Sequence, residues 1–438
     1  MMSIYLMMMF SFIINLFKFN LNLFFYQNFI FIIFFMFLIF NKILFFTMKF
    51  FWMLFIDYYS FYLILLTIWI MSLMFMSFMN MNFMKLYIYN LLIMMLSLML
   101  TFNSINYFMF YFFFEVSMLP TLFLIISWGN QYERMEAGIY MLMYTLFASL
   151  PMMIILFKIF YFSFSLNMIL LNNMNLINYL YMYIYLLLIF LVKLPMFMFH
   201  LWLPKAHVQA PISGSMILAA IMLKLGGYGI LRVMMIMENL CIKYNYIIIS
   251  LSLMGALYIS LICLQQIDMK MLVAYSSIVH MGTMISSLMM MNSTGYLSAM
   301  FMMISHGLCS SGLFCLVNMN YERIYSRSIF MNKGMMNLMP SLTFFWFMLS
   351  IFNMAAPPSL NLFSEIFMIN SVLSWSFSLI LILMLLSFFS VMYMMFFYSF
   401  IQHGMLYKNL NLFMFINIRE FMLLIFHLFP LIYLILFF

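Results

Sequence analysis

Four ionisable side chains lie deep inside apolar sequence, and their types suit proton transfer. Glu115 stands in FFFEVSMLP and Glu365 in LNLFSEIFM, while Lys193 stands in IFLVKLPMF and Lys224 in IMLKLGGYG. An ionisable residue at the centre of a bilayer costs about 2.5–3.5 kcal/mol on insertion scales, so its presence there is by default a functional hypothesis. The alternative is a static salt bridge, or a side chain that reaches to the membrane surface.

The segment Leu194–Ser215, LPMFMFHLWLPKAHVQAPISGS, places prolines and histidines inside apolar sequence. Irregular backbone at membrane depth is stable only where protein or a water-filled cavity satisfies its polar groups, so the segment is predicted to line an internal polar path. Lys193 precedes Pro195 by two residues, and the carbonyl groups freed by this proline can surround its ammonium. His200 and His207 fit an access route and a structural belt near a membrane face equally well.

Histidine and serine side chains recur at helical spacing in two later stretches. Ser276 and Ser277 are spaced to share a helix face with His280, and Ser310 is spaced to share one with His306. Hydroxyl and imidazole groups each donate and accept hydrogen bonds, so these faces can pass protons through intervening water. Hydrogen bonding between helices is the alternative for each of them.

The composition requires a membrane protein that crosses the bilayer many times. The 438 residues are 69% hydrophobic and 6% charged, which leaves too little polar surface to cover a soluble globule. The 60 Met and 58 Phe beside only 13 Gly and 9 Pro indicate A/T-rich codons and an organellar genome. The net charge of +8 is scattered over short loops, which is typical of membrane topology and not of nucleic-acid binding.

Motifs for nucleotide, flavin, zinc or iron–sulfur binding do not occur. The sequence contains no GxxxxGK[ST], GxGxxG, HExxH or paired CxxC, and the four cysteines have no metal-ligand spacing. We therefore expect no cofactor or metal in this chain, although bound lipids are possible. Any free energy for transport must come from a partner or from an ion gradient.

Apolar stretches of roughly 20 residues predict an all-α protein with about fourteen transmembrane helices. Prolines interrupt the seventh at Pro195 and the twelfth at Pro357, five helices apart, and broken helices in corresponding positions indicate two inverted repeats around a transport site. Ordinary proline kinks are the alternative. The predicted division is 1–85, a first repeat in 86–231, a second in 244–401 and a last helix in 402–438. The helices are expected near 4–17, 22–40, 50–78, 86–104, 106–127, 138–162, 177–203, 208–231, 244–264, 270–292, 295–317, 337–372, 374–400 and 415–437.

Several of these stretches together resemble a known family. FFFEVSMLPTLFLI from Phe112, VKLPMFMFHLWLPKAHV from Val192, DMKMLVAYSSIVHMG from Asp268 and PPSLNLFSE from Pro357 are similar to the chain 4 family of mitochondrial NADH:ubiquinone oxidoreductase, respiratory complex I. These proteins are antiporter-like subunits of the membrane arm. The resemblance covers most of 112–365, while the first hundred and last seventy residues are weakly diagnostic.

The resemblance implies a proton relay, a location and partners. The glutamate matching Glu115 modulates the broken-helix lysine matching Lys193, Lys224 and His280 continue the path, and Glu365 ends it. It also implies the mitochondrial inner membrane, neighbouring antiporter-like chains 2 and 5, and flavin, iron–sulfur and quinone sites in other subunits. The alternatives are a passive structural spacer of the membrane arm and a free-standing cation/proton antiporter of the Mrp type. Two positions depart from the family, which commonly has Glu at Gln209 and often Arg at Gln265, and we hypothesise that a surface charge pair was lost there.

Overall fold

The computed structural model describes residues 2–16, 23–40, 49–51, 54–77, 83–171, 179–406 and 416–437. The described chain is almost entirely helical and divides into two compact units. Unit 1 comprises Met1–Lys193 and Gln209–Ile242, and unit 2 comprises Leu194–Val208 and Lys243–Phe438. The four-part division expected from the sequence stays a prediction.

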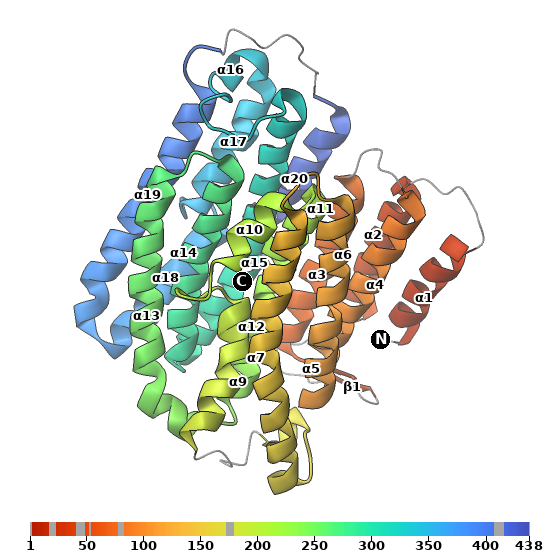
Figure 1. Cartoon of the computed structure of the whole chain (residues 1–438), viewed down its shortest axis with the longest axis vertical. Helices are drawn as coiled ribbons and strands as arrows, with labels where there is room; N and C mark the ends of the chain where they lie inside the picture. The colour runs from red at the N-terminus through yellow and green to blue at the C-terminus, as the bar shows by residue number, and fades with distance from the viewer. Residues whose placement is uncertain are drawn as a thin grey trace. The chain divides into compact units, whose positions relative to one another are not determined.

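Unit 1 begins with α1 (Met2–Leu16) and α2 (Leu23–Phe40), followed by the strands β1 (Lys49–Phe51) and β2 (Leu54–Ile56). In this unit α2 packs on α3, α3 packs on α4, and α7 packs on α9 (Figure 1). Their bounds are α3 (Tyr58–Met76), α4 (Met84–Asn103), α5 (Tyr107–Val116), α6 (Met118–Trp128), α7 (Arg134–Ser163), α8 (Met168–Leu171), α9 (Leu180–Lys193), α11 (Ile212–Ile217), the π-helix η1 (Leu218–Met222) and α12 (Leu223–Met234).

Unit 2 holds most of α10 (Trp202–Gln209) and most of α13 (Glu238–Gln265), and it is built around α15 (Ser293–Ile324). The helices α14, α17, α18 and α20 all pack against α15 (Figure 1). Their bounds and those of the remaining elements are α14 (Met269–Met289), α16 (Met335–Leu338), α17 (Pro340–Asn353), α18 (Leu360–Trp375), η2 (Phe377–Leu379), α19 (Ile380–Gln402), α20 (Ile418–Tyr433) and η3 (Leu434–Phe437).

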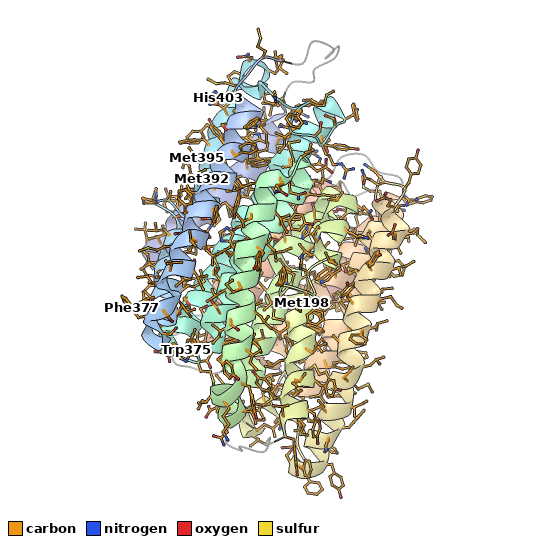
Figure 2. All side chains as sticks on the ribbon, turned by 60° about the vertical axis from the view of Figure 1, so that its left-hand side comes forward. Met198, Trp375, Phe377, Met392, Met395 and His403 are labelled. Atoms are coloured by element: carbon orange, nitrogen blue, oxygen red, sulfur yellow. The ribbon has the colours of Figure 1, made fainter. Side chains whose placement is uncertain are left out.

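Burial separates the central helix of each unit from its outer helices. In an apolar stretch of 18 residues within each helix, all residues are buried in Ile212–Met234 and in Ser293–Ile324. In the corresponding stretches of Arg134–Ser163 and Phe377–Gln402, only 39% and 28% are buried. The outer helices expose large apolar side chains, such as Phe147 on α7. Met392 and Met395 are exposed in the same way on α19 (Figure 2). An apolar outer surface of this extent requires lipid or a neighbouring apolar protein.

Ten described helices are long and apolar enough to cross a membrane, and Leu23–Ile39, Leu180–Lys193 and Pro340–Asn353 are shorter apolar helices. The two predicted interruptions have irregular backbone. Between Lys193 and Trp202 the chain forms turns, with Met198 at φ 85°, and between Asn353 and Leu360 it includes Ala355 at φ 58°. The backbone amide of Phe199 donates to the Met196 carbonyl at 3.0 Å, so a turn satisfies part of the first break.

The expected helix over 50–78 is wrong at its start. Residues 49–51 and 54–56 form an antiparallel hairpin, and the helix begins only at Tyr58. Asp57 is the N-cap, and its backbone amide donates to the Ser60 hydroxyl at 2.7 Å. A capping residue defines a helix start more strongly than uninterrupted hydrophobicity does. Residues 52–53 of this expected helix lie outside the described residues, as do ends of expected helices at 17, 22, 78, 177–178 and 415.

Candidate functional site

Glu115 lies at the end of α5, beside an interruption between α5 and α6. Pro120, in the first turn of α6, has no amide hydrogen to offer the carbonyl four residues earlier, which accounts for the break at Ser117. The Glu115 carboxylate is near enough to Lys193 on α9 and to Ser149 on α7 for both to influence it, while the Ser149 hydroxyl donates to the Leu146 carbonyl at 3.4 Å. Its Oε1 has no hydrogen-bond partner among the described residues. This half-buried carboxylate can therefore still accept a hydrogen bond from water or from a moving cation.

Lys193 is the last residue of α9 and is 1% exposed. Its Nζ lies 4.0 Å from the centroid of the Phe114 ring, which directly precedes Glu115 on α5. Within the described part of the chain, this Nζ has no hydrogen-bond partner. The ammonium is therefore held by an aromatic face and a neighbouring carboxylate instead of a closed ion pair, an arrangement that leaves its proton available for transfer.

Lys224 lies at the start of α12 and is completely buried. The π-helix η1 immediately precedes α12, and Lys224 Nζ donates to the carbonyl of Ala219 within that π-helix at 2.6 Å. A π-turn widens the helix and changes the direction of its carbonyl groups, and such turns are frequent at functional sites. The sequence contains no proline or other signal that predicts this turn.

Gly229 positions the two lysine-bearing helices of unit 1. A Cβ at Gly229 would lie 2.1 Å from the Phe190 ring on α9, so only glycine fits there. Small residues let helices in a membrane approach each other closely, and Gly229 is where α9 makes this contact with α12. The close approach of α9 and α12 fixes the helices that hold Lys193 and Lys224.

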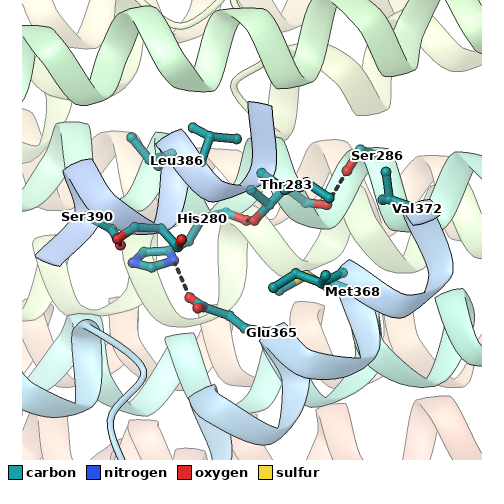
Figure 3. Close-up of a pocket in the computed structure, with 12 residues that line it drawn as sticks. His280, Thr283, Ser286, Glu365, Met368, Val372, Leu386 and Ser390 are labelled. Carbon is teal, nitrogen blue, oxygen red and sulfur yellow. Dashed lines mark hydrogen bonds and ion pairs between the residues drawn. The ribbon is translucent and has the colours of Figure 1, made fainter. Parts of the chain in front are cut away.

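His280 and Glu365 form a pair inside unit 2. His280 Nδ1 on α14 lies 3.5 Å from Glu365 Oε1 on α18, with side-chain exposures of 4% and 23% (Figure 3). The imidazole of His306 on α15 lies 5.7 Å from that of His280, centroid to centroid. His280 Nε2 has no hydrogen-bond partner in the described residues. The histidine can therefore exchange a proton with the carboxylate on one side and with water on the other.

A cavity of about 40 Å³ adjoins this pair. A water molecule needs at least roughly 10–15 Å³ of such space, so the cavity is large enough to admit water. Its lining includes Thr283, Ser286 and Ser390 beside the His280–Glu365 pair (Figure 3). These three hydroxyls donate to carbonyls of their own helices, so toward a water in the cavity they offer only acceptor oxygens.

The serines predicted to support the relay use their protons within their own helix. The hydroxyl of Ser276 donates to the Val273 carbonyl at 2.8 Å, and that of Ser277 donates to the Ala274 carbonyl at 2.6 Å. The hydroxyl of Ser310 donates to the carbonyl of His306 at 2.6 Å. These oxygens can still accept a hydrogen bond, but they are not free to donate one toward an imidazole.

His200 and His207 are both buried, at 8% and 0% exposure, and each stacks on an aromatic ring. His207 lies parallel to Phe314 on α15, with centroids 4.6 Å apart and an interplanar angle of 6°. His200 stacks on Phe197 at 5.6 Å. Stacking supports the structural interpretation of these histidines, and complete burial of His207 does not suit a residue at an open membrane face.

The structure thus divides the predicted relay between the units. Glu115, Lys193 and Lys224 belong to unit 1, and His280, His306 and Glu365 belong to unit 2. Sequence analysis missed the hydroxyls of Thr283 and Ser390 beside the central pair. Thr283 follows His280 by three residues on the same helix, which was a usable signal, whereas Ser390 lies on a different helix, α19, and only packing brings it there.

Cofactor ligands are not evident in the parts of the chain that the structure describes. There, no group of three or more His, Cys, Asp or Glu side chains is arranged to hold a metal ion. The four cysteines, Cys241, Cys263, Cys309 and Cys315, are free thiols in buried positions.

Comparisons with known proteins agree on one family. Residues 104–392 match the family described as NADH:quinone oxidoreductase/Mrp antiporter, TM. The chain is 51% identical to NADH-ubiquinone oxidoreductase chain 4 of Ceratitis capitata over 338 residues, 77% of this chain and 76% of that one. It is 48% identical to the protein of the same name from Locusta migratoria over 380 residues, 86% of this chain and 85% of that one.

The fold also matches a solved structure. A chain of respiratory complex I from Thermus thermophilus with bound NADH aligns with a TM-score of 0.83 at 19% identity, covering 93% of this chain and 89% of that chain. At this identity the likeness concerns the fold alone. Taken with the match over 104–392 and the relatives above 45% identity, it leads to one assignment. The chain belongs to the NADH:quinone oxidoreductase/Mrp antiporter membrane family, among the relatives named NADH-ubiquinone oxidoreductase chain 4.

Proposed function

We propose that this chain is a proton-translocating subunit in the membrane arm of respiratory complex I in the mitochondrial inner membrane. Glu115, Lys193, Lys224, His280 and Glu365 carry the protons in this proposal, and His306 supports the transfer between them. Quinone reduction by NADH, with its flavin and iron–sulfur centres, takes place in other subunits. The relatives named NADH-ubiquinone oxidoreductase chain 4 support the assignment to this complex.

The observation that carries the proposal is the environment of Lys193. Its ammonium is buried at a helix break, contacts the Phe114 ring and has no hydrogen-bond partner among the described residues. A desolvated cation–π contact is worth about 2 kcal/mol, whereas burying an ammonium costs several kcal/mol. The charged lysine therefore depends on the Glu115 carboxylate, and a change in the distance between them changes whether Lys193 holds its proton.

The energies are on the scale that proton pumping requires. At a separation of about 7 Å and an effective dielectric of about 20, a carboxylate stabilises an ammonium by roughly 2.4 kcal/mol. Moving one charge across a membrane potential costs about 2.3 kcal/mol per 100 mV. The two energies are therefore of the same scale, and in this proposal movement of the Glu115 side chain toward or away from Lys193 changes whether the lysine is protonated.

The second unit offers the matching receiving groups. His280, Glu365 and the adjoining cavity of about 40 Å³ combine an imidazole, a carboxylate and room for water. Protons move along such groups because each can accept on one side and donate on the other. In this proposal Glu365 is the last group of the relay in this chain, and the apolar outer helices contact lipid or the antiporter-like chains 2 and 5.

The test is proton pumping per NADH oxidised in reconstituted complex carrying Lys193→Met, made at the matching position of a genetically tractable homologue. Methionine keeps the length and apolar stem of lysine but cannot carry a proton. We expect assembled complex with pumping lost, with or without loss of quinone reduction. The matched control is Lys158→Met, because Lys158 contacts the exposed Tyr181 on the outer side and lies outside the relay.

Two outcomes would contradict the proposal. Unchanged rate and stoichiometry in Lys193→Met would mean that Lys193 is structural and that the subunit is a passive spacer of the membrane arm. Purification of the native chain outside an NADH-oxidising assembly would favour a free-standing antiporter of the Mrp type.

A further inference from the structure

One face of α12 carries a second buried polar series that the relay does not use. Lys224, Tyr228 and Arg232 follow each other at intervals of four residues, so they lie along the same side of the helix. Tyr228 is 0% exposed and Arg232 is 7% exposed. The series leads from the buried lysine to the end of α12 at Met234, where the chain leaves the helix.

Arg232 is held by contacts on several elements of unit 1. Its Nη1 lies 2.5 Å from Oδ2 of Asp57, the N-cap of α3, and its Nη2 donates to the Tyr228 hydroxyl at 2.9 Å. The hydroxyl of Tyr107 on α5 donates to the backbone carbonyl of Arg232 at 2.7 Å. The guanidinium also lies 5.5 Å from the centroid of the Phe55 ring on β2. This cation is therefore fixed in one position.

The order of the contacts matters for proton movement. The guanidinium lies between Tyr228, which is the residue nearer Lys224 on the helix, and Asp57, which lies beyond it. A proton that leaves Lys224 along this face therefore meets a cation before it reaches the carboxylate. Arginine is always charged in proteins, so it cannot accept that proton.

The Tyr228 hydroxyl also cannot relay a proton in this arrangement. It donates its hydrogen to the backbone carbonyl of Phe102 at 3.1 Å and accepts from Arg232 Nη2. A proton wire needs groups that accept from one neighbour and donate to the next. Arg232 cannot accept a proton, and its Nη2 occupies the Tyr228 oxygen that would otherwise accept one, so the guanidinium is the group that interrupts the series.

We propose that Arg232, fixed between Tyr228 and Asp57, is an electrostatic seal that prevents the Lys224 proton from escaping along α12 to the membrane face where α12 ends. Fixed arginines act as barriers to protons in other membrane pores. The seal directs the proton on Lys224 toward the relay, so this inference rests on the proposed function of Lys224. Its role is separate from that function, because a seal acts even when the complex is idle.

The test measures proton leak in proteoliposomes that contain whole complex, with an imposed pH gradient and no NADH. Arg232→Gln keeps a polar side chain of similar reach but removes the cation, and we expect it to raise the idle proton flux by about tenfold or more. Arg232→Lys retains the charge beside Asp57 and is expected to stay near the wild-type flux. Tyr107→Phe is the matched control, because it removes a contact to the Arg232 carbonyl and leaves the guanidinium in place.

Adding Lys224→Met to Arg232→Gln is expected to abolish the leak, since the escaping proton comes from that lysine. Where Arg232→Gln alone does not assemble because Asp57 is left as an unpaired buried charge, the double variant Arg232→Gln with Asp57→Asn removes that charge, and the same leak is expected. A wild-type flux in these uncharged variants, or a leak that persists without Lys224, would overturn the seal. Failure of the proposed function has a different result, which is unchanged pumping in Lys224→Met alone.

Discussion

Lys193 Nζ lies 4.0 Å from the centroid of the Phe114 ring. Phe114 directly precedes Glu115, whose carboxylate interacts electrostatically with the same lysine. The ring and the carboxylate are consecutive on α5, so a movement of this short helix changes both contacts together. The helix ends one residue after Glu115, at the break at Ser117, which leaves it less constrained than a continuous transmembrane helix. The lysine therefore responds to α5 as a whole.

The contact between Phe114 and Lys193 predicts the effect of Phe114→Leu. Leucine keeps apolar volume but has no aromatic face, so the charged lysine loses about 0.5–2 kcal/mol, equivalent to a roughly twofold to thirtyfold shift in its protonation equilibrium. We expect slower proton-coupled quinone reduction in fully assembled complex, measured as NADH oxidation in sealed proteoliposomes. Phe110→Leu is the control, because the Phe110 ring lies 5.8 Å from the Phe114 ring, centroid to centroid, whereas the cation–π contact of Lys193 is made by Phe114. Equal rates in the two variants would mean that the ring only fills space.

The lysines themselves were predictable from the sequence, and the reason is energetic. A charge in an apolar stretch is costly, so Lys193 and Lys224 stand out without any structure. The aromatic contact was not predictable, because Phe114 is one of 58 phenylalanines and only packing singles it out. The π-turn at η1 was also hidden, since helix periodicity changes there without a proline or glycine.

A larger residue at Gly229 is expected to disturb the packing of α12 against α9. In Gly229→Ala the added methyl meets the Phe190 ring at 2.1 Å, and overpacking of this kind costs about 1–3 kcal/mol. We expect α9 and α12 to separate, with less assembled complex and a lower midpoint of thermal inactivation. Gly138→Ala on α7 is the matched control, since its methyl would meet only flexible ends of Leu122 and Ile126 at 3.1–3.5 Å. A larger loss in the control than in Gly229→Ala would contradict the assigned contact.

Gln209 donates from Nε2 to Glu133 Oε2 at 3.1 Å, which gives the amide a partner. Restoring the family's commoner residue by Gln209→Glu would place two carboxylates together, at a cost of about 1 kcal/mol for a partly exposed pair. We expect the midpoint of thermal inactivation to fall by about 2 °C. Adding Glu133→Gln should restore it, and additive effects in this double-mutant cycle would show that the two residues do not interact.

Gln265 is the second position at which the sequence departs from the family, and its surroundings could not be predicted from the sequence. Gln265 is exposed at the end of α13 in unit 2, while Gln209 belongs to unit 1, so the idea that they replaced one charge pair stays a prediction. The contact to Glu133 could not be predicted, because Glu133 lies 76 residues earlier in the chain. The same reason hid Asp57 beside Arg232, since Asp57 caps α3 and Arg232 lies on α12, far away in the sequence.

The pair of His280 and Glu365 predicts a loss of pumping in Glu365→Gln. Glutamine has nearly the same shape and keeps a carbonyl oxygen for His280, but it can neither hold nor release a proton at the cavity. We expect assembled complex in which protons translocated per NADH fall and quinone reduction slows by about tenfold or more, in line with loss of one positioned proton-transfer group. The matched control is Glu238→Gln, because Glu238 is exposed at the start of α13 and faces no relay residue in the described chain. Unchanged stoichiometry in Glu365→Gln would remove Glu365 from the relay, and the cavity beside it would then have no role in proton transfer.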